Sequence, residues 1–225
     1  MDDRSRFVDL SHTIEDGMPV LPGLPTPRIG AHLTHDASRD KYEDAEFFLG
    51  KVDMPANVGT YLDSPFHRFR DREDLAEIPL ERIVGLRGAL LDASNAESRE
   101  LHPELPKDDL SGAAILIRSG WDSNWRTEAY FGAAPYLAES LATELVDRGV
   151  GLVGVDSWNV DDTTTGRRPI HTALLDAGIY VVEHLRGLDV LPSTGFRFFA
   201  PVIALRGGAS FTVRAFAELE PETGT

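Results

Sequence analysis

One stretch of the sequence is dense in polar residues: Asn57-Val58-Gly59-Thr60-Tyr61-Leu62-Asp63-Ser64-Pro65-Phe66-His67. It follows a predicted strand. Gly59 permits backbone angles that other residues resist. Pro65 excludes a regular helix, because proline removes a hydrogen bond and clashes with the preceding turn. We therefore expect Asp63 and His67 to converge through a rigid turn. A carboxylate and an imidazole held together in this way indicate a functional site, and a turn with a capping Asp and a surface His is the simpler alternative.

Apolar segments further along the chain predict the centre of an α/β sheet. Four segments are almost wholly apolar: 88–92, 113–118, 151–156 and 178–183. Strands that are buried on both faces have this composition. Segments 135–148 and 169–177 have helical spacing and begin with proline, which suits the first turn of a helix. We expect an α/β fold with covered strands, formed by residues 1–225 as a single domain.

The remaining segments predict shorter elements around this centre. Alternation of apolar and polar residues predicts a strand at 7–12, and the prolines of 17–25 predict an extended loop. We further expect a strand at 47–54, a short helix at 75–84, and β-rich segments between 196 and 216 that are broken by a Gly-Gly pair.

The composition excludes several classes of partner. The 225 residues include no cysteine, so disulfides and thiolate metal sites are impossible, and a reducing, cytoplasmic location fits. The 22 basic and 37 acidic side chains give a net charge of −15, which disfavours nucleic acid and anionic membranes. No apolar run approaches the roughly 18 residues of a membrane span. We expect a small-molecule substrate.

Two distant residues extend the candidate site. His171 opens the second helical segment, and Glu183 ends the last apolar run. A carboxylate at the end of a buried strand needs a paired charge, a metal ion or solvent, because an unpaired buried charge is costly. Together with Asp63 and His67, these residues supply imidazole and carboxylate ligands of the kind that bind Zn²⁺ or Mn²⁺.

Three separated blocks make the chain similar to a known family. The block 9–19 contains Asp-Leu-Ser-His and Gly-Met-Pro, and the block 57–67 falls on a His-x-Gly-Thr-His-x-Asp-x-Pro-x-His motif. The third block runs from Gly154 through His171 to Val182-Glu183-His184-Leu185. In these residues the chain resembles the cyclase family of metal-dependent hydrolases, which includes bacterial kynurenine formamidases and isatin hydrolases. The resemblance implies the swivelling β/β/α fold of that family and a homodimer or homotetramer.

The chain departs from the family motif at two positions, where Asn57 and Tyr61 replace histidines. The resemblance implies that those histidines and the Asp hold a first metal ion. It implies that Asp63, His171 and Glu183 hold a second. Asn is a weak carbonyl donor and Tyr binds well only as phenolate. We therefore expect one divalent metal ion, Zn or Mn, or none.

With this departure, the resemblance still predicts a hydrolase of a small amide, lactam or ester. A metal-activated water would attack the carbonyl. His67 would be the acid/base that takes the proton of that water and returns it to the leaving group. Tyr61 and Asn57 would orient the substrate through hydrogen bonds.

Three more residues are assigned to the pocket. Phe66 and Trp158 are expected to form an aromatic wall, or else to be ordinary core residues. His12 belongs to the N-terminal signature and is expected to line the pocket. The other histidines, His32, His35 and His102, are expected at the surface.

Two alternatives to this mechanism stay open. A family member that has lost its chemistry would be a metal-free pseudoenzyme that binds a small ligand. Alternatively, His67 and Tyr61 would catalyse the reaction without a metal. The second alternative predicts that activity survives chelation and falls in His67→Ala.

Overall fold

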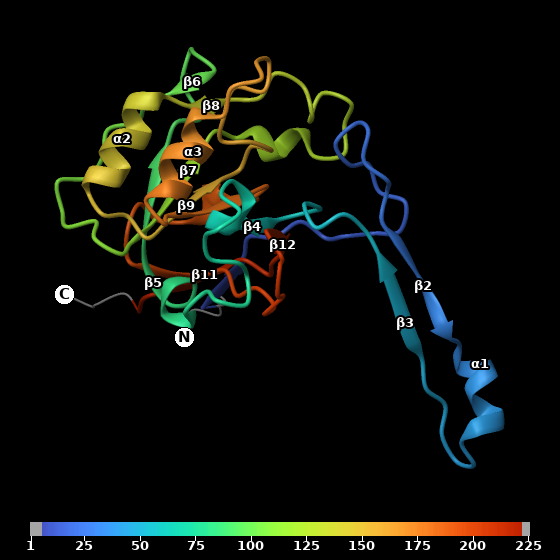
Figure 1. Ribbon diagram of the computed structural model, residues 1–225. Coiled ribbons are helices and arrows are strands. Elements are labelled where there is room, and N and C mark those ends of the chain that lie inside the picture. The colour runs from blue at the N-terminus through green and yellow to red at the C-terminus, as the bar shows by residue number, and fades with distance from the viewer. Residues whose placement is uncertain (1–5, 222–225) are drawn as a thin grey trace.

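A nine-stranded sheet forms the body of the protein in the computed structural model, which describes residues 6–221 (Figure 1). In spatial order its strands are β1 (Phe7–Asp9), β13 (Phe216–Leu219), β11 (Phe196–Phe199), β5 (Leu86–Asp92), β7 (Ala114–Arg118), β9 (Leu152–Val155), β10 (Tyr180–Glu183), β4 (Tyr61–Asp63) and β12 (Ser210–Thr212). The four adjacent strands β5, β7, β9 and β10 are parallel, and the other pairings are antiparallel. The predicted central strands are confirmed.

The parallel strands are apolar throughout because both of their faces are covered. Ile115 and Ile117 of β7 pack against α2 (Glu139–Asp147) and α3 (Pro169–Asp176), which lie on one face of the sheet (Figure 1). Leu116 faces the other way, into a second cluster. Successive side chains of a strand point to opposite faces, so each face needs its own apolar core.

The second cluster lies inside the curl of the sheet. Leu62 of β4 and Phe198 of β11 meet there with Leu116, although β4 and β11 are far apart in the strand order. All three side chains are fully buried. This packing fixes β4, and with it the end of the polar stretch 57–67, against the centre of the body.

Some of the predicted elements differ from the observed ones. The helix predicted at 75–84 is wrong: only the 3₁₀ turn η3 (Leu80–Arg82) forms there, preceded by Pro79 in extended conformation (φ −66°, ψ 133°). Pro79 prevents a longer helix here, because proline has no backbone N–H for the hydrogen bonds of a helix. The strand predicted at 7–12 is shorter, and the one at 47–54 is confirmed as β3 (Leu49–Asp53). The helix predicted from residue 135 begins only at Glu139, because Tyr136 and Leu137 pair as a short strand.

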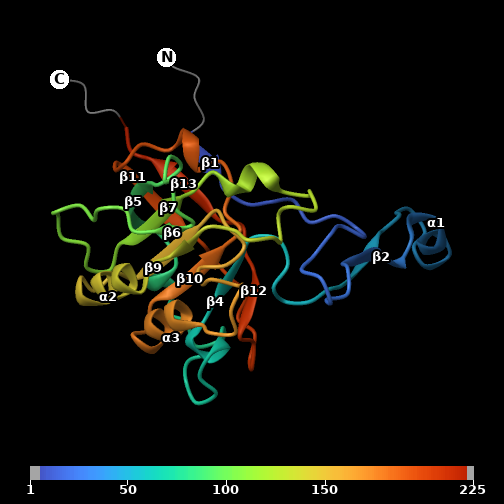
Figure 2. The same ribbon diagram turned by 90° about the horizontal axis from the view of Figure 1, so that it is seen from above.

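β3 belongs to an arm outside the main sheet. It pairs with β2 (Arg28–Leu33), and the connection between them holds α1 (His35–Ser38) and the 3₁₀ turn η1 (Arg39–Lys41). Figures 1 and 2 both show this arm projecting away from the body. Its strands pair only with each other among the described residues.

Short elements connect the rest of the chain: η2 (Pro65–His67), β6 (Glu100–Leu101), η4 (Trp121–Asn124), β8 (Tyr136–Leu137) and η5 (Leu188–Val190). Over residues 6–221, no helix has both the length and the apolar character that crossing a membrane requires.

Gly88 of β5 supplies a test of this packing. It lies opposite Phe196 of β11, and a Cβ atom at this position would overlap the Phe196 ring. We expect Gly88→Ala to lower the free energy of unfolding by about 1–3 kcal/mol, because the ring is buried and cannot move away without strain. Urea denaturation followed by circular dichroism measures this change.

The matched control is Gly30→Ala, on the arm, where an added Cβ would meet nothing within 4 Å. We expect this variant to stay within about 0.5 kcal/mol of the wild type, as exposed substitutions do. Combining Gly88→Ala with Phe196→Leu should cost less than the sum of the two single changes. Equal stability of Gly88→Ala and the wild type would contradict the packing described.

Candidate metal centre and the adjoining pocket

The register of β4 places its polar residues against two neighbouring strands. Asp63 lies opposite Ser210 of β12, and Tyr61 lies opposite Glu183 of β10. Paired residues of antiparallel strands point to the same face. The Ser210 hydroxyl therefore donates to Asp63 Oδ1, and the Tyr61 hydroxyl donates to Glu183 Oε2. Both carboxylates are fully buried.

The turn after β4 brings His67 back over Asp63. Pro65 begins the 3₁₀ turn η2, whose last residue is His67. His67 Nδ1 lies 3.7 Å from Asp63 Oδ1 and 3.1 Å from Ser210 Oγ. The convergence expected from the sequence is confirmed. The His67 side chain remains 38% exposed, so it is the solvent-facing member of the group.

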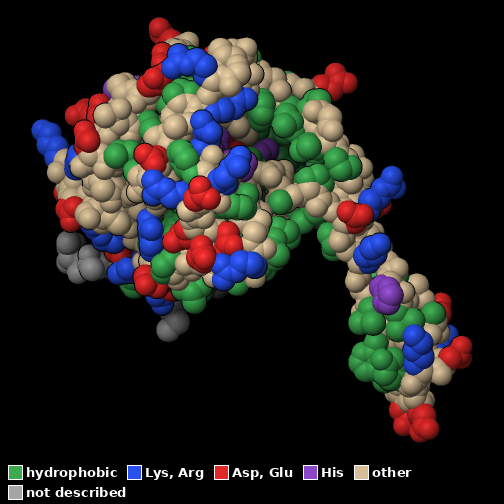
Figure 3. All heavy atoms as spheres, in the orientation of Figure 1, with side chains coloured by type: hydrophobic (Ala, Val, Ile, Leu, Met, Phe, Trp, Pro, Cys, Tyr) green, Lys and Arg blue, Asp and Glu red, His purple; other side chains and the backbone are tan. Residues whose placement is uncertain are grey.

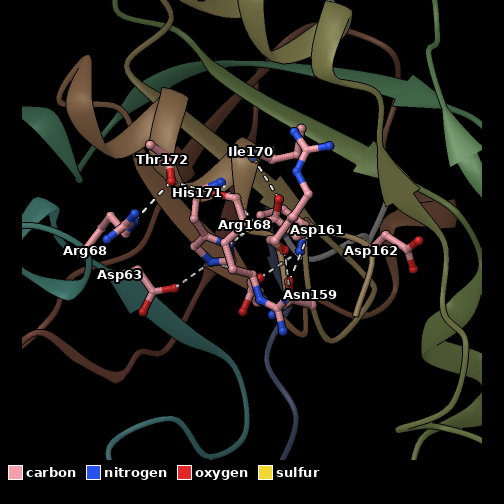
Figure 4. Close-up of polar contacts among 12 residues, drawn as sticks. Asp63, Arg68, Asn159, Asp161, Asp162, Arg168, Ile170, His171 and Thr172 are labelled. Atoms are coloured by element: carbon pink, nitrogen blue, oxygen red, sulfur yellow. Dashed lines mark hydrogen bonds and ion pairs between the residues drawn. The ribbon is translucent and has the colours of Figure 1, made fainter. Parts of the chain in front are cut away.

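Asp161 orients His171 toward these carboxylates. It accepts hydrogen bonds from the backbone N–H of Ile170 (2.7 Å) and of His171 (3.2 Å), at the start of α3. The His171 ring lies 2.6 Å from the same carboxylate through Nδ1 (Figure 4). Its Nε2 therefore faces the interior, 3.5 Å from Asp63 Oδ2 and 3.5 Å from Glu183 Oε1.

These atoms fit a divalent metal ion. Asp63 Oδ2 is buried without a hydrogen-bond partner. Such a buried acceptor destabilises the fold unless another group, such as a cation, binds to it. Ligand atoms about 2.1 Å from a tetrahedral metal ion lie roughly 3.4 Å apart, close to both 3.5 Å separations at His171 Nε2. Ligand atoms of Asp63, His67 and His171 all lie within 4.8 Å of one another, so His67 is near enough to act on a group bound at Asp63 and His171. A carboxylate that holds the other ring nitrogen of a ligating His is the usual outer support of such a site.

The buried charges also shift one another's protonation. Burial opposes ionisation of His171, but the surrounding Glu183, Asp161 and Asp63 carboxylates outweigh it and raise its pKa to about 10. Burial raises the pKa of Glu183 to about 7, although the His171 charge works against this. For Asp63, the nearby imidazoles and Ser210 overcome the effect of burial and lower the pKa. In the metal-free protein His171 is thus a cation among carboxylates, and a metal ion must displace its Nε2 proton.

Tyr61 and Asn57 stand beside this group in a different role. Burial and the charges of Glu183 and Asp63 raise the Tyr61 pKa well above its ordinary value, so Tyr61 is a neutral phenol and a poor metal ligand. Its hydroxyl is engaged with Glu183. Asn57 is half-buried next to it. The geometry therefore supports one metal ion, centred on Asp63 and His171.

A pocket adjoins the centre and shares Tyr61 with it. Figure 3 shows histidine side chains in a hollow whose border is rich in hydrophobic side chains, near the base of the arm. The lining includes Met18, Val58, Trp125, Phe131 and Trp158, with the polar residues Asn57, Tyr61, Asn159 and His184. Trp158 is thus in the pocket wall and also in a small aromatic cluster of the core. Asp63 and His171 are not part of this lining, and Tyr61, whose hydroxyl donates to Glu183, connects the pocket with the centre.

Two residues assigned to the pocket from the sequence are placed elsewhere. Phe66 is half-buried within η2 and is not part of this lining. His12 lies behind the wall, stacked on Trp125 with ring centroids 3.9 Å apart. Burial, with the charges of Arg186 and Arg126, lowers its pKa to about 4. His32, His35 and His102 are exposed as expected.

The sequence matches the Cyclase family model over residues 8–162 of 225. The chain belongs to the Cyclase family. It is 28% identical to the kynurenine formamidase of Bacillus cereus over 212 residues, which are 94% of this chain and 96% of that one. Its fold is similar to isatin hydrolase A from Labrenzia aggregata, with a TM-score of 0.80, 24% identity, and 96% and 94% of the two chains covered. A structure described as a potential metal-dependent hydrolase with cyclase activity has a TM-score of 0.75 at 22% identity, covering 96% of this chain and 98% of that one.

This member of the Cyclase family has site residues that its sequence did not reveal. Asp161 orients His171, Ser210 bridges Asp63 and His67, and His184 lines the pocket. The signal for Asp161 is weak: it is one of two adjacent aspartates in a polar loop before α3. Ser210 had no signal, because only strand pairing places it beside Asp63. His184 directly follows Glu183, and its position in the third sequence block was a usable hint.

We expect Asp63→Ala to abolish stoichiometric Zn²⁺ binding and Glu183→Gln to weaken it strongly, because both carboxylates face His171 Nε2. His67→Ala should keep most of the affinity, since His67 lies toward solvent. In the wild type, affinity should rise at least about tenfold for each pH unit near neutrality, because a proton must leave His171 as the metal binds, and below about pH 7 one must also leave Glu183. Titration calorimetry in two buffers of different ionisation enthalpy measures affinity and proton release.

Asp92→Asn is the matched control for these carboxylate variants. Asp92 ends β5 but is exposed and paired with Arg118 at 2.7 Å, away from the centre. We expect it to bind Zn²⁺ as the wild type does. Loss of binding in Asp92→Asn, or full retention in Asp63→Ala, would contradict the proposed centre.

Proposed function

We propose that this chain is a metal-dependent hydrolase of a small amide, lactam or ester. The observation that carries the proposal is the unpaired, buried Asp63 Oδ2 facing His171 Nε2, beside a pocket lined by aromatic rings. The names of its relatives, a kynurenine formamidase and an isatin hydrolase, agree with it. The net charge of −15 disfavours a polyanionic partner and leaves a small molecule as the expected substrate.

Asp63, His171 and Glu183 are the residues that would hold the metal ion, Zn or Mn. Both metals accept imidazole and carboxylate ligands. The bound ion would polarise the substrate carbonyl and lower the pKa of a water molecule. Asp161 would keep His171 Nε2 directed at this place, because its carboxylate accepts a hydrogen bond from His171 Nδ1–H.

His67 is suited to carry the proton. The single proton of the Ser210 hydroxyl is used in the hydrogen bond to Asp63. Ser210 Oγ therefore accepts the hydrogen bond that it shares with His67, and His67 Nδ1–H is the donor. The neutral His67 ring then has its lone pair on Nε2. With its side chain partly exposed, His67 can take a proton from water and return it to the leaving group.

Tyr61 and Asn57 would position the substrate between the pocket and the metal centre. Tyr61 forms the wall that the two share, and its hydroxyl holds Glu183 in place. The half-buried Asn57 lines the pocket and has an amide that can donate to a carbonyl oxygen. The Asn57 amide would then take over part of the role of a second metal ion through a hydrogen bond to the substrate carbonyl, while Tyr61, whose hydroxyl proton is engaged with Glu183, would position the substrate by contact.

We expect the Zn²⁺- or Mn²⁺-loaded protein to hydrolyse at least one compound in a panel of aryl formamides, lactams and aryl esters. His67→Ala should lower kcat about 10²- to 10⁴-fold, because it removes the proton carrier, while metal content is unchanged. His102→Ala is the control, since His102 is exposed and pairs with Glu144 far from the pocket.

A metal-free protein that hydrolyses nothing in the panel would refute this proposal and leave the ligand-binding pseudoenzyme. Activity that survives a chelator but falls in His67→Ala would instead favour catalysis by His67 and Tyr61 without a metal ion. Elemental analysis of the purified protein, done alongside the assays, separates the three outcomes.

We further propose that the chain is one domain, located in the cytoplasm, that self-associates as a homodimer or homotetramer through the arm. The lack of cysteine supports this location, because it fits a reducing compartment. Self-association is supported by the exposed apolar side chains of the arm. An isolated two-stranded hairpin is marginal in water, and grouped apolar side chains mark interaction sites. The exposed set is Ile29, Tyr42, Phe47, Phe48, Leu49 and Val52.

We expect Phe48→Asp combined with Val52→Lys to convert the oligomer to a monomer, because both side chains are more than half exposed on the arm. Light scattering coupled to size-exclusion chromatography measures the mass. Leu80→Asp is the control: it is 66% exposed but lies on the body. A wild type that is already monomeric, or a double variant with the wild-type mass, would contradict the proposal.

A further inference from the structure

His184 is a buried imidazole that the proposed reaction does not use. It follows Glu183 at the end of β10, and its φ of 59° lies in the left-handed region that residues other than glycine seldom adopt. Two hydrogen bonds hold the backbone there: its N–H donates to the Ser157 carbonyl (3.0 Å), and its carbonyl accepts from the Thr60 hydroxyl (2.5 Å). Strained backbone of this kind gathers at functional sites. The ring is therefore held in one place.

Tyr130 decides which nitrogen of His184 carries the proton. The Tyr130 hydroxyl lies 2.9 Å from His184 Nδ1, and Tyr130 is fully buried. Among residues 6–221 this hydroxyl has no other hydrogen-bond partner. If Nδ1–H were the donor, the hydroxyl proton would be buried without an acceptor, which is unfavourable. Tyr130 therefore donates to Nδ1, and the neutral ring carries its proton on Nε2.

The Nε2–H group of His184 is free to meet a molecule in the pocket. His184 lines this pocket together with Asn57 and Tyr61. No residue of the described part of the chain accepts a hydrogen bond from its Nε2. Over the same residues, only two fully buried side-chain nitrogen or oxygen atoms lack a hydrogen-bond partner, and they belong to His12 and Asp63. His184 Nε2 is thus unpaired but accessible, and the pocket is the space that it lines.

We propose that His184 is a substrate-binding residue whose Nε2–H donates to an oxygen acceptor of an uncharged acyl substrate, with Tyr130 as its positioning residue. This rests on the proposed hydrolase function. The pocket lining contains no Lys, Arg, Asp or Glu, so nothing in it pairs with a charged group. Trp125, Phe131 and Trp158 offer flat apolar surfaces to the rest of such a substrate.

Kinetics with formanilide, an uncharged aryl formamide, test the contact. We expect His184→Phe, which keeps a ring but loses the donor, to raise KM about tenfold, the loss of one hydrogen bond. The value of kcat should change little, because the contact is made in ground and transition states alike. His184→Asn keeps a donor and tolerates left-handed backbone, so it should recover part of the loss. His32→Phe, on the exposed arm, is the control.

Nuclear magnetic resonance of ¹⁵N-histidine-labelled protein tests the tautomer directly and does not require turnover. We expect His184 as the Nε2–H form, a shift of its Nε2–H resonance on addition of formanilide, and a mixture of tautomers in Tyr130→Phe. An Nδ1–H form, an unchanged resonance at saturating formanilide, or an unchanged KM in His184→Phe would overturn the inference. A shifted resonance together with no hydrolysis of any compound in the panel would refute the hydrolase proposal and leave the binding role of His184 intact.

Discussion

The pairing of β4 between β10 and β12 is the constraint on which the rest of the site depends. β4 has only three residues, yet each of its two polar side chains meets a partner across a strand boundary: Tyr61 with Glu183 and Asp63 with Ser210. A shift of one residue would turn these side chains to the opposite face of the sheet. Leu62, between them, is buried in the cluster inside the sheet and opposes such a shift.

Burial of several ionisable groups around His171 gives the centre its chemistry. Three carboxylates approach this one imidazole, and only one oxygen among them, Asp63 Oδ2, lacks a hydrogen-bond partner within the described residues. Burying charges without full compensation destabilises a fold. A bound cation would relieve this cost, which links the stability of the folded chain to metal binding. At low pH the same cluster has a lower affinity for a metal ion, because His171 then keeps its Nε2 proton.

Tyr61 and Asn57 change the character of the site without changing the fold. A neutral phenol that donates to Glu183 occupies one oxygen of that carboxylate and separates the centre from the aromatic pocket. On the pocket side, Tyr130 and His184 form a second, uncharged hydrogen-bonded pair. The site therefore combines a charged inner part and a neutral outer part. This division suits a substrate that is apolar at one end and has a reactive carbonyl at the other.

By itself, the sequence determined the parallel strands, both long helices and the turn at Pro65, because apolar runs, helical spacing and proline act locally. It also supplied Asp63, His67, His171 and Glu183 as a set. The helix predicted at 75–84 failed because Pro79 outweighed the apolar spacing. Only the tertiary structure decided that Ser210 and Asp161 support the centre, that Tyr130 fixes the tautomer of His184, and that β3 lies on a projecting arm. These features depend on strand register and on contacts between distant segments, which no local pattern in a single chain encodes.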